Sequence, residues 1–339
     1  MPHPARGTVT LHDVAAEAGV SLATASRVLG GSSRTVAAGL RERVRAAAER
    51  LRYTADASAR AMRRMSDSLA LIADDLTTPS MAVVVSAMER EASTAGAFVT
   101  VSATRGDPER QLETIHRVRA LRPRALVLTS GRVSADALAG RLLAELRAYE
   151  HDGGRVVIVG DTDLPFHSVG FDNLGAARVL GRHVAEKGHR RVAIIAGARQ
   201  AAQSARTTGF VDGLRTGGVE ESAVRIVHCE VSREGGFDAA RRLAAEGLDG
   251  TDAILAANDL IAVGVLRALR EAGVMVPRDV SLTGFDDTRL AVNVTPRLTT
   301  VALPLAYAGT EAIRLALGEP DAVTHVTVEG RLVVRDSVR

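Results

Sequence analysis

The stretch "VTLHDVAAEAGVSLATASRVL", residues 9–29, decides how the amino-terminal part of this chain folds. Thr10, followed three residues later by Asp13, is typical of a capped helix start. Gly19 is suited to end that helix because glycine adopts a left-handed backbone without a Cβ clash. Ser21 is placed to cap a second helix at once. Two helices joined only through Gly-Val-Ser must cross steeply, which predicts a helix-turn-helix.

The second helix has a buried face and an outward face. Helical spacing buries three apolar residues, Ala25, Val28 and Leu29. The outward side chains are Leu22, Ala23, Ser26 and Arg27. An arginine on a helix surface donates two hydrogen bonds to guanine, and Leu or Ala contacts a thymine methyl. The hydroxyls suited to phosphate contacts are those of Ser21, Thr24 and Ser26. The alternative is a small helical subdomain with a solvated arginine.

A third helix is predicted by apolar residues at helical spacing between Val36 and Leu51. Its outer face carries a run of arginines, Arg41, Arg43, Arg45, Arg50 and Arg52. Such a run suits DNA contacts, and a merely solvated face is the alternative.

Charge separates the amino-terminal segment from the rest of the chain. Residues 1–66 hold 11 arginines against 5 acidic residues, a net charge of +6, whereas the other residues carry −3. A basic head on a mildly acidic body predicts a polyanion partner for the head. Lys187 is the only lysine, so arginine replaces lysine throughout and a single arginine is weaker evidence than usual.

Composition excludes several classes of protein. The 339 residues, 46% of them hydrophobic, suit two or three domains, and no apolar run of membrane-spanning length occurs. The amino terminus lacks the apolar core of a signal peptide, and Cys229 is the only cysteine, so we expect no internal disulfide and a cytoplasmic location. We expect no metal site and no cofactor, because the histidines are scattered and no phosphate-binding or nucleophile motif is present.

The rest of the chain alternates short apolar runs with amphipathic segments. The apolar runs form two sets, at residues 69–73, 97–102, 125–129 and 155–160, and at 191–197, 224–228, 252–259 and 279–287. Continuous apolar strands alternating with helices indicate parallel sheets covered on both faces, and two sets indicate two lobes. Ligands of such sheets bind beyond the carboxyl ends of the strands, so we expect a site between the lobes.

Polar side chains follow several of these strands. They are Asp75, Ser80, Arg206, Asn258 and Asp286, with Pro79 directly before Ser80. An arginine, an asparagine and carboxylates that converge suit a hydroxyl-rich ligand. Each key residue also has a structural alternative: Asn258 and Asp286 are suited to cap helices, and Arg206 to form a surface ion pair.

Through "TLHDVAAEAGVSLATASRVL" (10–29) and "RERVRAAAERLRY" (41–53), the chain resembles the lactose-repressor (LacI/GalR) family of bacterial transcription regulators. The resemblance continues to "LVVRDS" (332–337). It implies a hinge helix within the linker 54–68 that forms on operator DNA and inserts Met62 into the minor groove. The candidate DNA-binding residues are therefore Thr10, Ser21, Leu22, Ala23, Thr24, Ser26, Arg27 and Met62.

The resemblance also implies effector contacts. "SARTTGF" places Arg206 on the ligand-clamping arginine of the family, and "AANDLIAVG" and "GFDD" place Asn258 and Asp286 on its polar contacts. Phe171 falls where the family has an aromatic or apolar residue against the effector. The candidate effector-binding residues are therefore Asp75, Pro79, Ser80, Phe171, Arg206, Asn258 and Asp286.

Three positions depart from the family pattern. Ala55-Asp56 stands where a Pro-Asn pair often precedes the hinge helix, and Val231 replaces a frequent stacking aromatic. Ala302-Leu303 replaces an Arg-Gln pair, so we expect a less polar pocket than in sugar-binding relatives.

The expected fold is an all-α helix-turn-helix head (1–53), a hinge (54–68) and a two-lobed body of doubly wound α/β sheets (69–339), similar to periplasmic binding proteins. The lobes are expected at about 69–171 with 305–320, and at about 172–304 with 321–339. The leading hypothesis is a homodimeric repressor that binds near-palindromic operator DNA and a small polar effector. A periplasmic sugar-binding protein is the second hypothesis. An enzyme is the third, and no catalytic residue is assigned.

Overall fold

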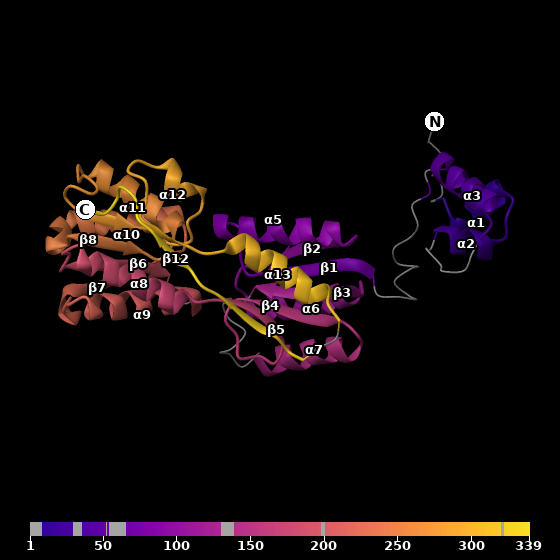
Figure 1. Cartoon of the computed structure of the whole chain (residues 1–339), viewed down its shortest axis with the longest axis horizontal. Coiled ribbons are helices and arrows are strands. Elements are labelled where there is room, and N and C mark those ends of the chain that lie inside the picture. Colours follow the sequence, from indigo (N-terminus) through magenta and orange to yellow (C-terminus); the bar gives the residue numbers. More distant parts are fainter. Residues whose placement is uncertain are drawn as a thin grey trace, which may run out of the picture. The chain divides into compact units, whose positions relative to one another are not determined.

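The computed structural model describes residues 9–29, 36–51, 53, 66–129, 139–197, 201–319 and 322–339. The chain divides into two compact units, Met1–Ser66 and Asp67–Arg339 (Figure 1). Most of the expected hinge, including Met62 and Ala55-Asp56, lies outside the described residues. The head and the body are therefore treated one at a time.

The head contains the three predicted helices. They are α1 (Leu11–Ala18), α2 (Leu22–Leu29) and α3 (Ala38–Arg50). Thr10 and Asp13 form a reciprocal capping box at the start of α1, and Gly19 ends that helix with φ 61°. The three helices share a small core built around Val14, Ala25, Val44 and Ala47. The helix-turn-helix prediction is confirmed, and alanine in the core is what allows such short helices to cross closely.

The first lobe of the body is a six-stranded sheet in the order β11-β5-β4-β3-β1-β2. Its strands are β1 (Ser66–Ala73), β2 (Phe98–Ala103), β3 (Pro123–Thr129), β4 (Arg155–Val159), β5 (His167–Phe171) and β11 (His325–Val328). The pairs β1–β2, β3–β4, β4–β5 and β5–β11 are parallel. The inner strands β1, β3, β4 and β5 are largely buried, as their continuous apolar runs predict, whereas the edge strands β2 and β11 are partly exposed.

Helices cover both faces of this first sheet. They are α5 (Pro79–Thr94), α6 (Pro108–Arg119), α7 (Ala139–His151) and α13 (Leu305–Leu317). Leu69 and Leu71 of β1 pack in one core cluster with residues of α5 and α13. Ala70 and Ile72 pack in another with residues of α6 and α7. The alternation of side chains along one strand thus separates two helical layers.

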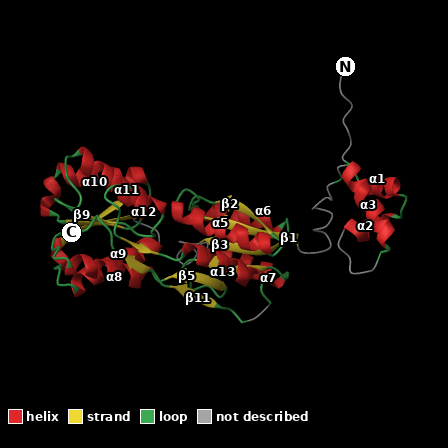
Figure 2. Cartoon of the chain, turned by 45° about the horizontal axis from the view of Figure 1, so that its top comes forward, coloured by secondary structure: helices red, strands yellow, loops and turns green. Residues whose placement is uncertain are grey.

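The second lobe is a parallel four-stranded sheet in the order β7-β6-β8-β9. Its strands are β6 (Val192–Gly197), β7 (Val224–Cys229), β8 (Ala253–Ala256) and β9 (Ser281–Thr283). Its main helices are α8 (Asn173–Glu186), α9 (Ala201–Thr216), α10 (Arg233–Ala245) and α11 (Asp259–Glu271), with the short α12 (Arg289–Asn293). Figure 2 shows α8 and α9 on one side of this lobe and α10 and α11 on the other. The predicted doubly wound architecture is confirmed.

Glycines allow the helix pairs of the second lobe to pack closely. A Cβ at Gly213 of α9 would lie 2.1 Å from the carbonyl oxygen of Arg178 on α8. A Cβ at Gly264 of α11 would lie 1.9 Å from the carbonyl oxygen of Arg233 on α10. Both distances are too short for any side chain, so these positions require glycine.

The carboxyl-terminal segment corrects one expected boundary. Residues 321–339 were expected in the second lobe, but β11 pairs in parallel with β5 of the first sheet. The chain then returns, and β12 (Arg331–Val333) pairs antiparallel with β10 (Thr300–Ala302). The apolar positions of "HVTV" cover the open side of β5, so this strand extends the first sheet before the chain crosses back.

Candidate functional site

The recognition face of α2 is open. Leu22, Ala23 and Arg27 are exposed, Ser26 is half-buried, and Ala25 is fully buried on the opposite side. Among the described residues, Arg27 has neither a hydrogen-bond nor an ion-pair partner. The side chains expected to read bases are therefore presented together and are not engaged within the described head.

The hydroxyls expected at phosphates also hold the helix starts. The Ser21 hydroxyl accepts a hydrogen bond from the Thr24 N–H at 3.2 Å and lies 2.9 Å from the Thr24 hydroxyl. The Thr10 hydroxyl donates to Asp13 at 2.7 Å. Hydrogen bonds from the Thr10 backbone and hydroxyl lower the pKa of Asp13. These hydroxyls lie at helix amino termini, where backbone N–H groups favour a phosphate.

The arginines on the outer face of α3 differ in their partners. Arg43 donates to the carbonyl oxygens of Ala18 and Gly19. Arg50 pairs with Glu17 at 3.1 Å. Arg41 donates to the carbonyl oxygen of Val36, just before the start of α3. Arg45 is exposed, whereas Arg52 lies outside the described residues. The described arginines of this run are all exposed, as the spacing predicts, and several of them also hold the head together through these contacts.

Arg206 is the centre of the polar cluster in the body. Its side chain is buried on α9, and its guanidinium donates to Asn173 Oδ1 at 2.8 Å and to the Ala257 carbonyl oxygen at 2.7 Å. Its third nitrogen lies 2.8 Å from Asp286 Oδ1, and its Cζ atom stands 4.1 Å from the centre of the Phe285 ring. The expected alternative of a surface ion pair is wrong, because both partners of this pair are buried.

Asp286 joins the second lobe to the first. It follows β9, has φ 100°, and accepts a side-chain hydrogen bond from Ser80 on α5 of the first lobe. Burial raises the pKa of Asp286, and the positive charge of Arg206 opposes that rise. One carboxylate thus contacts the central arginine and the opposite lobe.

Asn258 and Phe171 lie at the ends of two strands. The Asn258 side-chain oxygen accepts a hydrogen bond from the Ile261 N–H at 2.8 Å, so Asn258 caps α11. Its structural role is confirmed, and its role in effector binding stays a prediction. Phe171 is half-buried at the end of β5.

The remaining predicted effector residues form the start of α5. Asp75 accepts hydrogen bonds from the backbone and hydroxyl of Thr77, so it closes its own loop. Pro79 is the first residue of α5, where a missing N–H costs nothing, and Ser80 follows it. Of these three residues, Ser80 is the one with a described hydrogen bond to the second lobe.

The candidate effector residues leave out three members of the cluster, although Asp259 is recognised from the sequence as a strand-end residue. Asn173 accepts from Arg206, and Asp161 accepts hydrogen bonds from the Phe171 backbone and the Asn173 side chain. Asp259, next to Asn258, is buried and accepts hydrogen bonds from Thr288 and Thr300. All three follow the ends of strands β4, β5 and β8, so the strand-end rule applied to every strand would have found them.

Asp259 is a second buried carboxyl group of the cluster. Burial, followed by the nearby negative charge of Asp286, raises the pKa of Asp259 to about 7. The hydrogen bonds from Thr288 and Thr300 oppose this rise. Two buried carboxyl groups therefore lie close enough to interact, and Arg206 pairs with one of them, Asp286.

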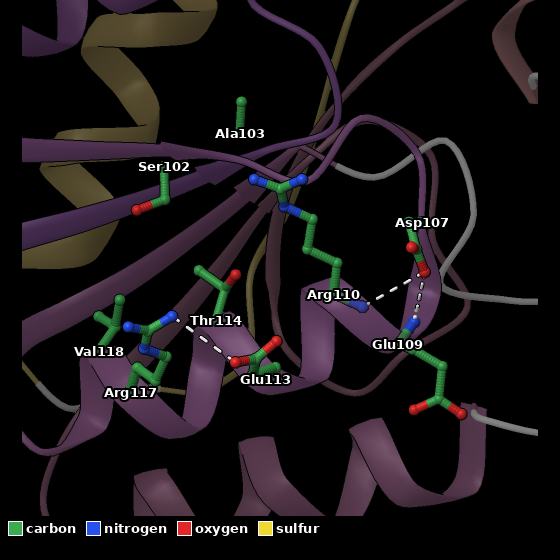
Figure 3. A pocket seen from close by; sticks show the side chains of 9 residues that line it. All are labelled: Ser102, Ala103, Asp107, Glu109, Arg110, Glu113, Thr114, Arg117 and Val118. Atoms are coloured by element: carbon green, nitrogen blue, oxygen red, sulfur yellow. Dashed lines mark hydrogen bonds and ion pairs between the residues drawn. The ribbon is translucent and has the colours of Figure 1, made fainter.

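A surface hollow of about 750 Å³ lies elsewhere, between the end of β2 and α6 (Figure 3). Its charged side chains are largely engaged along α6: Asp107 caps the helix, and Arg117 pairs with Glu113 at 3.6 Å. None of the predicted effector residues lines it.

The residues that the structure describes contain no group of three or more His, Cys, Asp or Glu side chains arranged to hold a metal ion. They also contain no helix long and apolar enough to cross a membrane.

The comparisons with known proteins place both units. Residues 10–56 match the model of bacterial regulatory proteins of the lacI family, and residues 182–338 match that of the periplasmic binding protein-like domain. The transcriptional regulator GalR of Salmonella typhimurium is 31% identical over 97% of this chain and 96% of its own. A solved structure of the lac repressor dimer bound to operator and the anti-inducer ONPF matches with TM-score 0.81 and 27% identity, over 98% of this chain and 99% of that one.

A second solved structure carries a sugar. The complex of the transcriptional regulator CelR with cellobiose matches with TM-score 0.70 and 28% identity, over 97% of this chain and 99% of that one. These relatives are transcriptional regulators, which argues against the hypothesis of an enzyme. With its helix-turn-helix head and its two-lobed body, this chain belongs to the LacI/GalR family of DNA-binding transcriptional regulators.

Proposed function

We propose that this chain is a homodimeric repressor whose affinity for a near-palindromic operator is controlled by a small, hydroxyl-rich effector. One observation carries the proposal. The same chain presents an open recognition face on α2 and a buried polar cluster, centred on Arg206, that links the two lobes. A DNA-reading surface and a lobe-closing site are the two parts that a ligand-controlled regulator needs.

In this proposal the head reads DNA through α2. Arg27 contacts a guanine, while Leu22 and Ala23 contact base methyl groups and Ser26 a base edge or a phosphate. The phosphate contacts are assigned to Thr10, Ser21 and Thr24. Met62, which lies outside the described residues, is assigned to the minor groove as an apolar wedge.

The homodimer has support from the exposed edge of the first sheet. Strand β2 is the last strand of that sheet, and Phe98 and Val101 on it are 58% and 41% exposed. An apolar edge strand of this kind is usually covered by another chain or element. The lac repressor relative was crystallised as a dimer on its operator, and we propose the same assembly here.

We assign effector binding to residues from both lobes. Ser80, Asp75, Pro79 and Phe171 belong to the first lobe, and Arg206, Asn258 and Asp286 to the second. To this set we add Asn173 and Asp161, because both contact the same cluster. Cellobiose in the CelR relative supports a carbohydrate effector. Val231 and the apolar Leu303, which is buried, support a pocket that is less polar on one side.

The test begins with selection of an operator from a library of random-sequence duplexes by the purified full-length protein. Fluorescence anisotropy on the selected duplex then measures affinity with and without a panel of mono- and disaccharides. The proposal expects one half-site sequence in both arms, a protein dimer on the duplex, and a change in affinity with one sugar class. Selection of no sequence contradicts the DNA-binding part, and a stable monomer on the duplex contradicts the homodimer.

A further inference from the structure

Arg43 is on α3, but its hydrogen bonds go to the turn between α1 and α2. Its Nε donates to the Ala18 carbonyl oxygen at 3.2 Å. Its Nη2 donates to the same oxygen at 2.9 Å and to the Gly19 carbonyl oxygen at 3.0 Å. One guanidinium therefore binds the last two carbonyl groups before the turn.

These carbonyl groups are a specific target. The last carbonyls of a helix have no partner inside the helix, and they carry the negative end of its dipole. A guanidinium is planar and always charged, so it binds two such oxygens with a fixed geometry. Gly19 is followed after one residue by Ser21, which caps α2. The contact therefore fixes the segment from which the recognition helix starts.

The core beneath α2 is small. Ala25 is the one residue of α2 that is fully buried, and Val28 and Leu29 pack against the same head cluster while only half-buried. These apolar contacts lie in the middle and at the carboxyl end of α2, so its amino end depends more on polar contacts. The carbonyl contact supplies a polar restraint at the amino end, where base-reading residues of such helices lie.

We propose that Arg43 is a positioning residue for DNA recognition, which acts through the α1–α2 turn and makes no phosphate contact of its own. The DNA readout of this inference rests on the proposed function. Loss of Arg43 lets α2 shift in the head, so contacts that depend on side-chain register suffer, whereas non-specific attraction to phosphates persists. Sequence discrimination is therefore lost more than affinity.

The experiment uses the full-length protein, the selected operator duplex and a duplex of shuffled sequence. Affinity for each is measured over a range of salt concentrations for the wild type, Arg43→Ala, Arg43→Lys and the exposed control Arg45→Ala. Arg43→Ala is expected to lower the ratio of the two affinities about tenfold or more and to keep the slope of log affinity against log salt. Arg45→Ala is expected to keep the ratio.

Arg43→Lys separates a positioning role from general damage to the head. Its ammonium group still donates to a helix-end carbonyl but lacks the planar group and the second donor, Nε, that fix the geometry of the contact with Ala18, so an intermediate ratio is expected. Equal loss of affinity for both duplexes, with a slope reduced by about 0.9 per arginine removed, makes Arg43 a phosphate contact and overturns the proposal. A wild-type ratio in Arg43→Ala also overturns it.

Amide exchange without DNA provides an arm that does not depend on the proposed function. In Arg43→Ala, faster exchange is expected in the turn and in the first residues of α2, whereas α1 and α3 should keep their protection from exchange. If Arg43→Ala loses protection from exchange over the whole head, the Arg43→Lys protein is used in its place. Wild-type exchange together with a wild-type ratio of the two DNA affinities in Arg43→Lys then rejects the positioning role. If the wild type selects no DNA sequence but Arg43→Ala still exchanges faster in the turn, the proposed DNA-binding function is contradicted and the structural role of the turn contact is supported.

Discussion

Arg27 in the head and Arg206 in the body are the same side chain in opposite situations. Arg27 is exposed and has no described partner, whereas Arg206 is buried and makes two hydrogen bonds, an ion pair and a contact with an aromatic ring. An exposed donor is available to a rigid external partner such as a base edge. The contacts of Arg206 use one N–H of each nitrogen and hold the other N–H groups in place. A ligand that replaces one of these partners changes the protein.

This difference assigns DNA sequence recognition to the head and a ligand-dependent conformational change to the body. In the head, recognition residues are displayed on a preformed helix, and binding needs little reorganisation there. In the body, Arg206 is held by Asn173 and Asp286, and Asp286 also contacts Ser80 of the other lobe. Any effector that competes for Arg206 or Asp286 therefore acts on the contact between lobes. This is the kind of differential contact that a conformational switch requires.

The largest expected effect separates the two regions completely. Removal of residues 1–66, the first compact unit, should abolish binding to the selected operator. The body should stay folded, because its core clusters lie within residues 67–339. Gel shift, with circular dichroism and thermal unfolding as controls, checks this. A truncated protein that still shifts the operator would show that DNA recognition lies outside the head.

Replacement of Arg206 by alanine should remove the effector response and destabilise the body. It leaves the buried carboxylate of Asp286 and the buried amide of Asn173 without their main partner, and loss of one member of a buried ion pair costs about 3–5 kcal/mol. Urea unfolding and sugar titration measure the two effects.

The exposed arginine Arg178, on α8, provides the control for this experiment. It pairs with Asp212 at the surface, so Arg178→Ala should change stability by less than about 1 kcal/mol. Operator binding should survive in both variants below their unfolding transitions. A sugar response that persists in Arg206→Ala rules out the clamping role.

Much of the fold was predictable because local signals agreed with the tertiary structure. The Thr10 cap, the Gly19 stop and the alanine-lined crossing define the head, and continuous apolar runs define the sheets. Strand β11 was placed in the wrong lobe, because a four-residue strand carries no signal for which of two sheets it extends. Where the chain crosses from one lobe to the other depends on tertiary packing, which the hydrophobic periodicity of the sequence does not predict.

The site was predictable by position but not by partner. Arg206 and Asp286 were expected to converge, yet the sequence does not show that they would bind each other, with Asn173 and Ala257 completing the set. Likewise the α3 spacing places Arg43 on an outer face, whereas its long side chain reaches back to α1. Arginine is long enough for its head group to act far from its own helix face.

Replacement of Arg27 by alanine should cost about 1–3 kcal/mol of operator binding and relax the preference at one base position in each half-site. Its exposure means that folding should be unaffected, in contrast with Arg206. Selection from a library randomised at single positions, with thermal unfolding as a control, measures both. A uniform loss across all sequences, with no change in preference, would identify Arg27 as a phosphate contact.

The smallest expected effect concerns pH and the buried carboxyl group beside the cluster. Asp259 has a pKa near 7 in the folded body, against 3.8 for an ordinary aspartate. The folded state therefore holds this proton more tightly than the unfolded state does. The resulting stability is fully present below pH 3.8, falls as the pH rises toward 7, and changes no further above that value. Most paired carboxylates have the opposite dependence.

Asp259→Asn replaces the titrating group by a neutral one of similar shape. The free energy of unfolding of the wild type relative to this variant should fall as the pH rises from 5 to 7 and then level off. Contributions from His183 and His189, whose pKa values are lowered by burial, are common to both proteins and cancel in the difference. The exposed Asp238 on α10 provides a matched Asp→Asn control. A difference between wild type and Asp259→Asn that is constant over this range would show that Asp259 stays ionised. In that case its hydrogen bonds from Thr288 and Thr300 outweigh both burial and the charge of Asp286.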